Sequence, residues 1–201
     1  FPLQTLEDDA VPRTTETLCA GDILITGFEQ GTPISFAQVV CILPLVNVAA
    51  GTHLNFIRHS QNTSPTDGPA TPTSTLHVTV SVPLVRGLSY AVFNNTPLEL
   101  ARLDTSDTVG TALSGETWPA NVASTDTVML YTVSGVFKPL HAVGFRDALG
   151  GAPNFGSLCS EATVVLDNSP TSTSYVLTGV NPAYNFEDLG QPTVFIQIGR
   201  A

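Results

Sequence analysis

The chain has little charge, and very little of that charge is positive. Of its 201 residues only 12% are charged, and seven basic residues, with Lys138 the single lysine, stand against seventeen acidic ones, for a net charge of −10. Nucleic acids and anionic membrane surfaces both attract clustered Lys and Arg. The composition therefore argues against nucleic acid and anionic membranes as partners.

Cysteine is equally scarce, with three residues: Cys19, Cys41 and Cys159. Cys41 lies in an apolar run, where a thiol behaves as a small hydrophobic side chain. Cys19 and Cys159 lie in the similar contexts LCAGD and LCSEA, so we expect them to form a disulfide; the alternative is three unpaired thiols in a reducing compartment. Closing a loop of about 140 residues would stabilise the fold by about 5 kcal/mol in the chain-entropy model.

Long apolar runs are absent as well. No stretch reaches the roughly 18 to 20 apolar residues that span a bilayer, and no signal peptide is visible. The chain begins at Phe1, which is typical of a mature secreted chain whose leader has been removed. Two N-glycosylation sequons, at Asn62 and Asn94, agree with this. We expect a secreted or cell-surface location without membrane insertion.

What the chain does contain is a succession of short strand patterns separated by turn residues. Residues 21–57 read as three consecutive strands, expected to form a meander on which the other strands are laid. In the first strand Ile23 and Ile25 should face one side and Phe28 the other. Further strands are expected at residues 75–82, 88–93, 127–133, 136–145, 162–166, 174–177 and 193–198, with residues 98–103 as a strand or a single helical turn.

These patterns indicate the fold class. No stretch of twelve residues keeps a helical period, and residues 127–133 and 136–145 should pair through a two-residue turn at Ser134-Gly135. Ten or so short strands with turns between them predict an all-β, antiparallel β-sandwich of jelly-roll or Greek-key type, with long Thr/Ser/Pro/Gly loops. We expect a polar N-terminal arm over residues 1–18 and one domain over residues 19–201.

Residues 59–74 form the most biased of the expected loops. They hold three prolines and many Ser and Thr residues and show no apolar periodicity. This composition is typical of an O-glycosylated segment, and it is equally typical of a plain surface loop.

Residues that often carry catalysis are few and scattered. The four histidines are His53, His59, His77 and His141; none lies in an HxH or HExxH motif, and we expect each on a polar face. No GxSxG motif marks a serine nucleophile. Cys159 as a nucleophile would need a histidine such as His141, and a structural disulfide is preferred. We therefore expect no enzyme activity.

Candidates for metal binding are limited to two acidic pairs. Asp104 with Asp107, and Glu187 with Asp188, lie on expected loops and offer carboxylate oxygens of the kind that calcium takes. Neither has the dense DxDxDG spacing of a calcium loop. We assign no metal site, and calcium stays an open option.

Aromatic residues in loops suggest a second kind of site. Trp118, beside Pro119 in a polar loop, and Tyr184 are candidates for stacking on sugars. The alternative for Trp118 is that its ring covers one end of the sandwich.

Several short motifs resemble a secreted all-β domain of bacterial cell-surface proteins. They are AGDI at residues 20–23, GF at 27–28, AGT at 50–52 followed by Phe56, STDT at 124–127, and NP-x-YNF at 181–186. The resemblance spans residues 20–186 and implies a non-catalytic extracellular module without naming a ligand. Arg58 stands where that family tends to carry an acidic residue, so an ion site there is in doubt.

Together these observations predict a secreted structural protein. We expect a self-assembling surface or filament subunit, joined to copies of itself by strand-edge or arm-exchange contacts. The alternative hypothesis is a non-catalytic carbohydrate-binding module that binds extracellular glycans through Trp118 and Tyr184.

Overall fold

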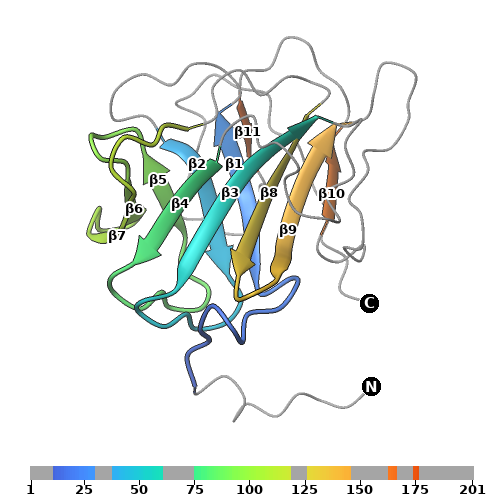
Figure 1. Cartoon of the computed structure of the whole chain (residues 1–201). Helices are drawn as coiled ribbons and strands as arrows, with labels where there is room; N and C mark the ends of the chain where they lie inside the picture. Colours follow the sequence, from blue (N-terminus) through green and yellow to red (C-terminus); the bar gives the residue numbers. More distant parts are fainter. Residues whose placement is uncertain are drawn as a thin grey trace.

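The computed structural model describes residues 11–29, 38–60, 75–118, 126–145, 163–166 and 174–176. Within them the chain forms strands and no helix, which confirms the all-β prediction, and no described helix is long and apolar enough to cross a membrane. The strands (Figure 1) are β1 (Ile23–Glu29), β2 (Gln38–Pro44), β3 (His53–Ser60), β4 (Thr75–Val80), β5 (Tyr90–Phe93), β6 (Glu99–Arg102), β7 (Thr108–Ala112), β8 (Asp126–Val133), β9 (Phe137–Phe145), β10 (Thr163–Leu166) and β11 (Ser174–Val176).

All the strands belong to one sheet in the order β10-β9-β8-β3-β4-β7-β6-β5-β2-β1-β11. From β9 to β1 every neighbour pairs antiparallel, β11 adds to β1 antiparallel, and β10 adds to β9 in parallel. The sheet curls until β1 and β9 approach each other, and the Gly21 amide donates to the Leu140 carbonyl at 2.8 Å. The antiparallel strands are therefore nearly closed into a barrel-like shape (Figure 1).

The predicted opening meander is wrong beyond its first hairpin. β2 pairs with β1 and β5, whereas β3 pairs with β4 and β8 in another part of the sheet. The reason lies in residues 45–52, which do not turn back beside β2. Val48, in the middle of this link, is buried and forms a bridge to Leu84, so the link crosses the end of the barrel.

A β-bulge overturns the predicted facing of β1. The register of β1 against β2 shifts between Ile25 and Gly27. A bulge adds one residue to one strand and so reverses which side the following residues face. Phe28 consequently joins Ile23 and Ile25 in the same core cluster, although strict alternation puts it on the opposite face.

The other strand predictions differ in smaller ways. The strand predicted over residues 75–82 forms as β4, in which Leu76 and Val78 are buried, but it ends at Val80. The 98–103 segment is a strand, β6, and β7 lies in a stretch for which no strand was predicted. The β8–β9 hairpin is confirmed, but its strands are joined by residues 134–136, with Gly135 at a positive φ of 73°.

Apolar side chains fill the interior of the barrel. The largest fully buried ones include Trp118, Tyr90 and Phe56, packed among aliphatic residues from every strand between β1 and β9. A second, smaller cluster lies on the opposite face of the sheet, where Ile57, Met129 and Ala142 stand side by side across β3, β8 and β9. The interior is thus a packed core.

Candidate functional site

Residues 11–22, which we call the N-terminal strap, cross the lower end of the barrel in Figure 1. The Arg13 amide donates to the Asn47 carbonyl, and the Ala49 amide donates to the Arg13 carbonyl, both at 2.8 Å. Leu18 is fully buried in the core cluster. Residues 11–18 are therefore a packed part of the barrel and not a free arm, because Leu18 supplies core volume. Residues 1–10 lie outside the described residues.

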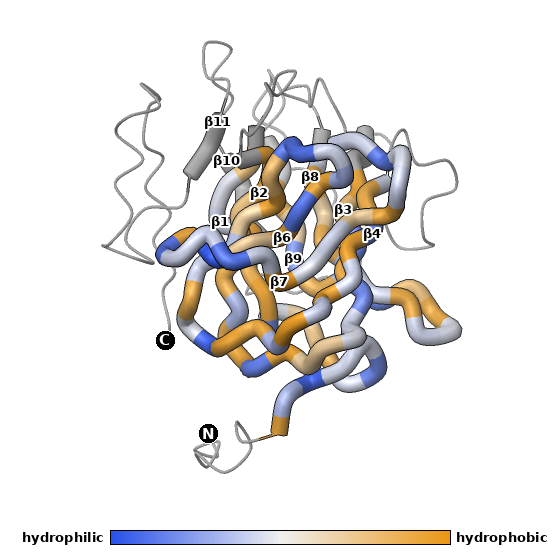
Figure 2. The backbone as a smooth tube through the Cα atoms, turned by 90° about the vertical axis from the view of Figure 1, so that its left-hand side faces the viewer, coloured by the Kyte–Doolittle hydropathy of each residue, from blue (hydrophilic) through white to orange (hydrophobic). Residues whose placement is uncertain are grey.

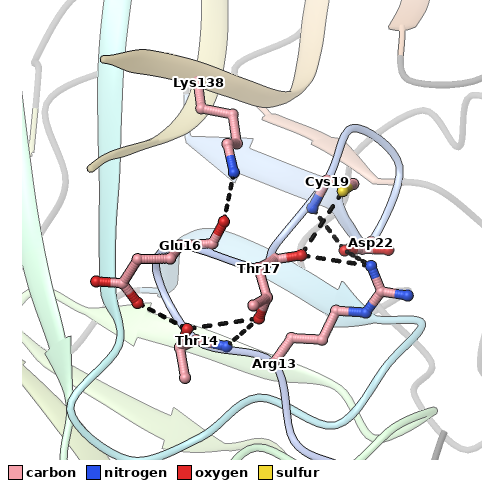
Figure 3. Close-up of polar contacts among 7 residues, drawn as sticks. All are labelled: Arg13, Thr14, Glu16, Thr17, Cys19, Asp22 and Lys138. Atoms are coloured by element: carbon pink, nitrogen blue, oxygen red, sulfur yellow. Dashed lines mark hydrogen bonds and ion pairs between the residues drawn. The ribbon is translucent and has the colours of Figure 1, made fainter. Parts of the chain in front are cut away.

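A salt bridge closes the strap on itself (Figure 3). The Arg13 guanidinium donates to Asp22 Oδ2 at 3.1 Å, and the same oxygen accepts the Cys19 amide at 2.6 Å. Arg13 also donates to the Thr17 carbonyl at 3.4 Å. The Asp22 carboxylate is thus committed to holding the turn that leads into β1.

A second contact ties the strap to the far side of the barrel. The Lys138 ammonium, at the start of β9, donates to the Glu16 carbonyl oxygen at 2.7 Å (Figure 3). The Glu16 side chain accepts a hydrogen bond from the Thr14 hydroxyl at 2.8 Å, and this bond lowers the pKa of Glu16. On the inner side of the strap, Thr15 Oγ1 accepts the His53 amide at 3.0 Å. The strap therefore links β1, β3 and β9.

His141 completes the approach of β1 to β9 just above the strap. Its Nδ1 atom accepts the Ile25 amide at 3.1 Å, so the neutral ring carries its proton on Nε2. The side chain is 2% exposed, and burial lowers the pKa of His141 to about 4. The predicted polar-face position is wrong for His141, because its ring supplies the acceptor that a neighbouring strand would otherwise supply to Ile25.

The same end of the barrel presents exposed apolar side chains, which we call the valine face: Val11, Val82, Val85, Val133 and Val136. These residues come from the strap, the β4–β5 link and the β8–β9 hairpin. Figure 2 shows hydrophobic residues along the chain at this end. Sequence reasoning missed this group because its members lie far apart in the chain.

Hydrogen bonds hold the segments of the valine face together. Leu84, between Val82 and Val85, forms two backbone hydrogen bonds of 2.9 Å with Val48, one in each direction. The Val85 amide donates to the buried Tyr90 hydroxyl at 2.7 Å, and the Arg86 amide donates to Asn47 Oδ1 at 2.9 Å. The Asn47 carbonyl also accepts the Arg13 amide of the strap. The β4–β5 link and the strap therefore form one rigid surface.

The predicted glycan-binding residues do not form a site in the described part of the chain. Trp118 is 2% exposed and belongs to the core cluster, so its ring is not presented to a sugar. This favours the interpretation that it covers part of the barrel. Tyr184 lies outside the described residues. Of the two sequons, Asn94 follows β5 and is half-buried, and Asn62 lies outside the described residues.

The predicted disulfide stays a prediction. Cys19 lies in the strap as an exposed thiol without a disulfide, 3.6 Å from the Thr17 carbonyl oxygen, and Cys159 lies outside the described residues. Cys41 is buried in β2 as predicted, and burial raises the pKa of its thiol to about 12.

Several charged side chains away from the strap have structural partners. Glu116 accepts the His77 amide at 2.7 Å and contacts His77 Nδ1, so it caps β4 where β7 has ended. Arg102 donates to Asp104 Oδ1 at 2.9 Å, and this bond lowers the pKa of Asp104. Among the described residues no group of three or more His, Cys, Asp or Glu side chains is placed to hold a metal ion. Glu187 and Asp188 lie outside them.

Comparison with known proteins gives no relative from which a role could be taken. No protein-family model, curated protein or solved structure matches this chain. The resemblance to secreted bacterial surface domains stays a prediction. What the strapped end of the barrel can do follows from its own side chains: committed polar groups, a rigid backbone and an exposed apolar surface.

Proposed function

We propose that this chain is a secreted or cell-surface structural protein that assembles with copies of itself, using the valine face as a contact surface. The observation that carries the proposal is the distribution of exposed apolar side chains. Six large hydrophobic residues are exposed among the described residues, and all but Leu113 lie on the valine face. Scattered exposed hydrophobic residues are normal, whereas apolar residues gathered at one place mark an interaction surface.

The rigidity of this end supports the proposal. Gly21, Gly51, Gly87 and Gly135 all take positive φ values in its turns, which fixes short connections between the strands. The strap adds hydrogen bonds from Arg13 and Lys138. A surface already ordered before binding loses less conformational entropy on association, and more of the apolar contact remains as net affinity.

A scaffold role also agrees with the interior of the barrel. Large side chains such as Trp118, Tyr90 and Phe56 fill it, and the buried His141 holds a backbone amide. These groups act in packing and in strand closure. We therefore propose that the protein functions through its surface and has no catalytic role.

We further propose that the barrel-like sheet is a flattened β-sandwich of Greek-key type. The order of strands supports this, since the β1–β2 and β3–β4 hairpins are adjacent in sequence but separated in the sheet by β5, β6 and β7. The β8–β9 hairpin then returns to pair with β3. Such long returns between hairpins are typical of Greek-key sandwiches.

Light scattering after size-exclusion chromatography, at rising protein concentration, tests the proposed assembly. We expect the mass of the wild-type chain to rise with concentration and the double variant Val85→Ser/Val136→Ser to stay monomeric. Leu113→Ser is the matched control, because it removes an equally exposed apolar side chain away from the valine face. A monomeric wild-type chain, or equal loss of association in the control, would overturn the proposal.

A further inference from the structure

We propose that the valine face binds residues 1–10 of a neighbouring copy, so that copies are joined by exchange of their N-terminal segments. This inference rests on the proposed self-assembly and names the segment that occupies its contact surface. Val11 belongs to the valine face, so the ten preceding residues begin directly at the surface that they would occupy on another copy.

The sequence of this segment complements the valine face. Residues 1–10 read FPLQTLEDDA, with apolar side chains at Phe1, Leu3 and Leu6, followed by three acidic residues. Phe and Leu side chains are the kind that bury against exposed valines, and each buried side chain of this size contributes substantially to binding. Fully extended, ten residues span about 33 Å.

Charge supports the same pairing. Arg86 follows Val85 directly, and Lys138 lies two residues after Val136. The strap, the β4–β5 link, residues 133–138 and the adjoining turn between β6 and β7 carry four basic residues (Arg13, Arg86, Arg102 and Lys138) and four acidic ones (Glu16, Asp22, Asp104 and Asp107), a balance of zero in a chain of net charge −10. An acidic segment therefore meets less repulsion at this end of the barrel than over the rest of the surface.

The local chain chemistry favours a neighbouring copy over the segment's own barrel. Val11 precedes Pro12, and a residue before proline is restricted to extended conformations. We therefore assign residues 1–10 to a neighbouring copy, because an extended Val11 favours a chain that leaves the strap over one that turns back on it.

Peptide competition with the full chain tests this inference. A synthetic peptide of residues 1–10 is added to the wild-type chain and association is followed by light scattering. We expect the peptide to block association, and the same peptide with Phe1→Ser, Leu3→Ser and Leu6→Ser to have no effect. In the full chain the same three substitutions should weaken self-association at least about tenfold, roughly 1.4 kcal/mol.

The outcomes separate this inference from the proposed function. If the full chain with Phe1→Ser, Leu3→Ser and Leu6→Ser associates like wild type, while Val85→Ser/Val136→Ser does not, the exchange of residues 1–10 is wrong and self-assembly stands. If the peptide leaves wild-type association unchanged, the exchange is also wrong. If wild type never associates, the proposed function itself fails.

Discussion

His141 is a buried titratable residue whose acid–base chemistry is changed by its surroundings. Its Nδ1 accepts the Ile25 amide, and the strands packed around it bring no charge to the ring. β1 offers only apolar or hydroxyl side chains between Ile23 and Phe28, β8 offers Tyr131 as its one titratable group between Thr127 and Val133, and β10 has none in its sequence. A protonated ring would lose its acceptor atom and hold an unpaired buried charge.

We predict that folding stability depends on the charge state of His141. Its pKa falls from the ordinary 6.5 to about 4 in the folded chain. Between these values the unfolded chain binds more protons, so the stabilisation is complete above pH 6.5 and is lost as the pH falls toward 4, by about 3 kcal/mol in total. Urea unfolding across this pH range measures it.

Two variants of His141 separate its hydrogen bond from its charge. In His141→Asn the amide oxygen can still accept the Ile25 amide but does not titrate, so the pH dependence between 6.5 and 4 should become shallower than in wild type. His141→Leu leaves the Ile25 amide unpaired and should cost about 1–3 kcal/mol even at neutral pH. Equal pH dependence in wild type and His141→Asn would show that His141 does not control it.

Leu18 anchors the strap as a core residue. We predict that Leu18→Ala lowers the free energy of unfolding by about 2–5 kcal/mol, because it leaves a cavity in a packed interior. Hydrogen exchange at the Arg13 and Ala49 amides should accelerate together, since both bond the strap to residues 47–49. Glu16→Ala, an exposed change in the same segment, is the control, with an expected effect within about 0.5 kcal/mol. Unchanged exchange in Leu18→Ala would argue against the strap as one unit.

Among the elements, β7 approaches the backbone of β4 so closely that it requires a glycine at position 110. A Cβ atom at Gly110 would lie 2.6 Å from the Thr79 carbonyl oxygen of β4. We predict that Gly110→Ala destabilises the protein by about 1–3 kcal/mol, because the two backbones must separate. Thr108→Ala, an exposed change on the same strand, should cost no more than about 1 kcal/mol. Thermal unfolding of the two variants compares them, and equal values would contradict the predicted clash.

Elements with a strong local pattern could be predicted from the sequence. The alternation of Leu76 and Val78 in β4 follows the period of a strand, and the apolar run of residues 128–131 marks β8. β7 could not, because TVGTA has few apolar residues and its Gly110 serves a contact with β4 that only the folded chain reveals. Phe28 was placed on the wrong face because a bulge between Ile25 and Gly27 leaves no mark in the apolar pattern.

The candidate site was less predictable than the strands. Val82 and Val133 read as the continuation of alternating strands, yet Val82 lies beyond the end of β4 and both side chains are exposed. Their proximity to the strap depends on the order of strands in the sheet, which joins residues more than a hundred positions apart. His141 likewise reaches Ile25 only because β9 and β1 meet at closure.

At the scale of the whole molecule, a filled barrel carries most of the exposed apolar side chains of its described residues at the strapped end. The core and the hydrogen bonds of the strap hold that end in place, and only 12% of the residues of the chain are charged. A net charge of −10 opposes association at long range, so the apolar contact must exceed this repulsion. Association through the valine face is thus the property on which the account depends.

Sedimentation velocity of the wild-type chain and of Val85→Ser/Val136→Ser, over a wide range of concentration, tests this property most directly. The account predicts that the sedimentation coefficient of the wild-type chain rises with concentration, while that of the double variant stays at the monomer value with the fold intact. A wild-type chain that sediments as a monomer at every concentration would contradict it.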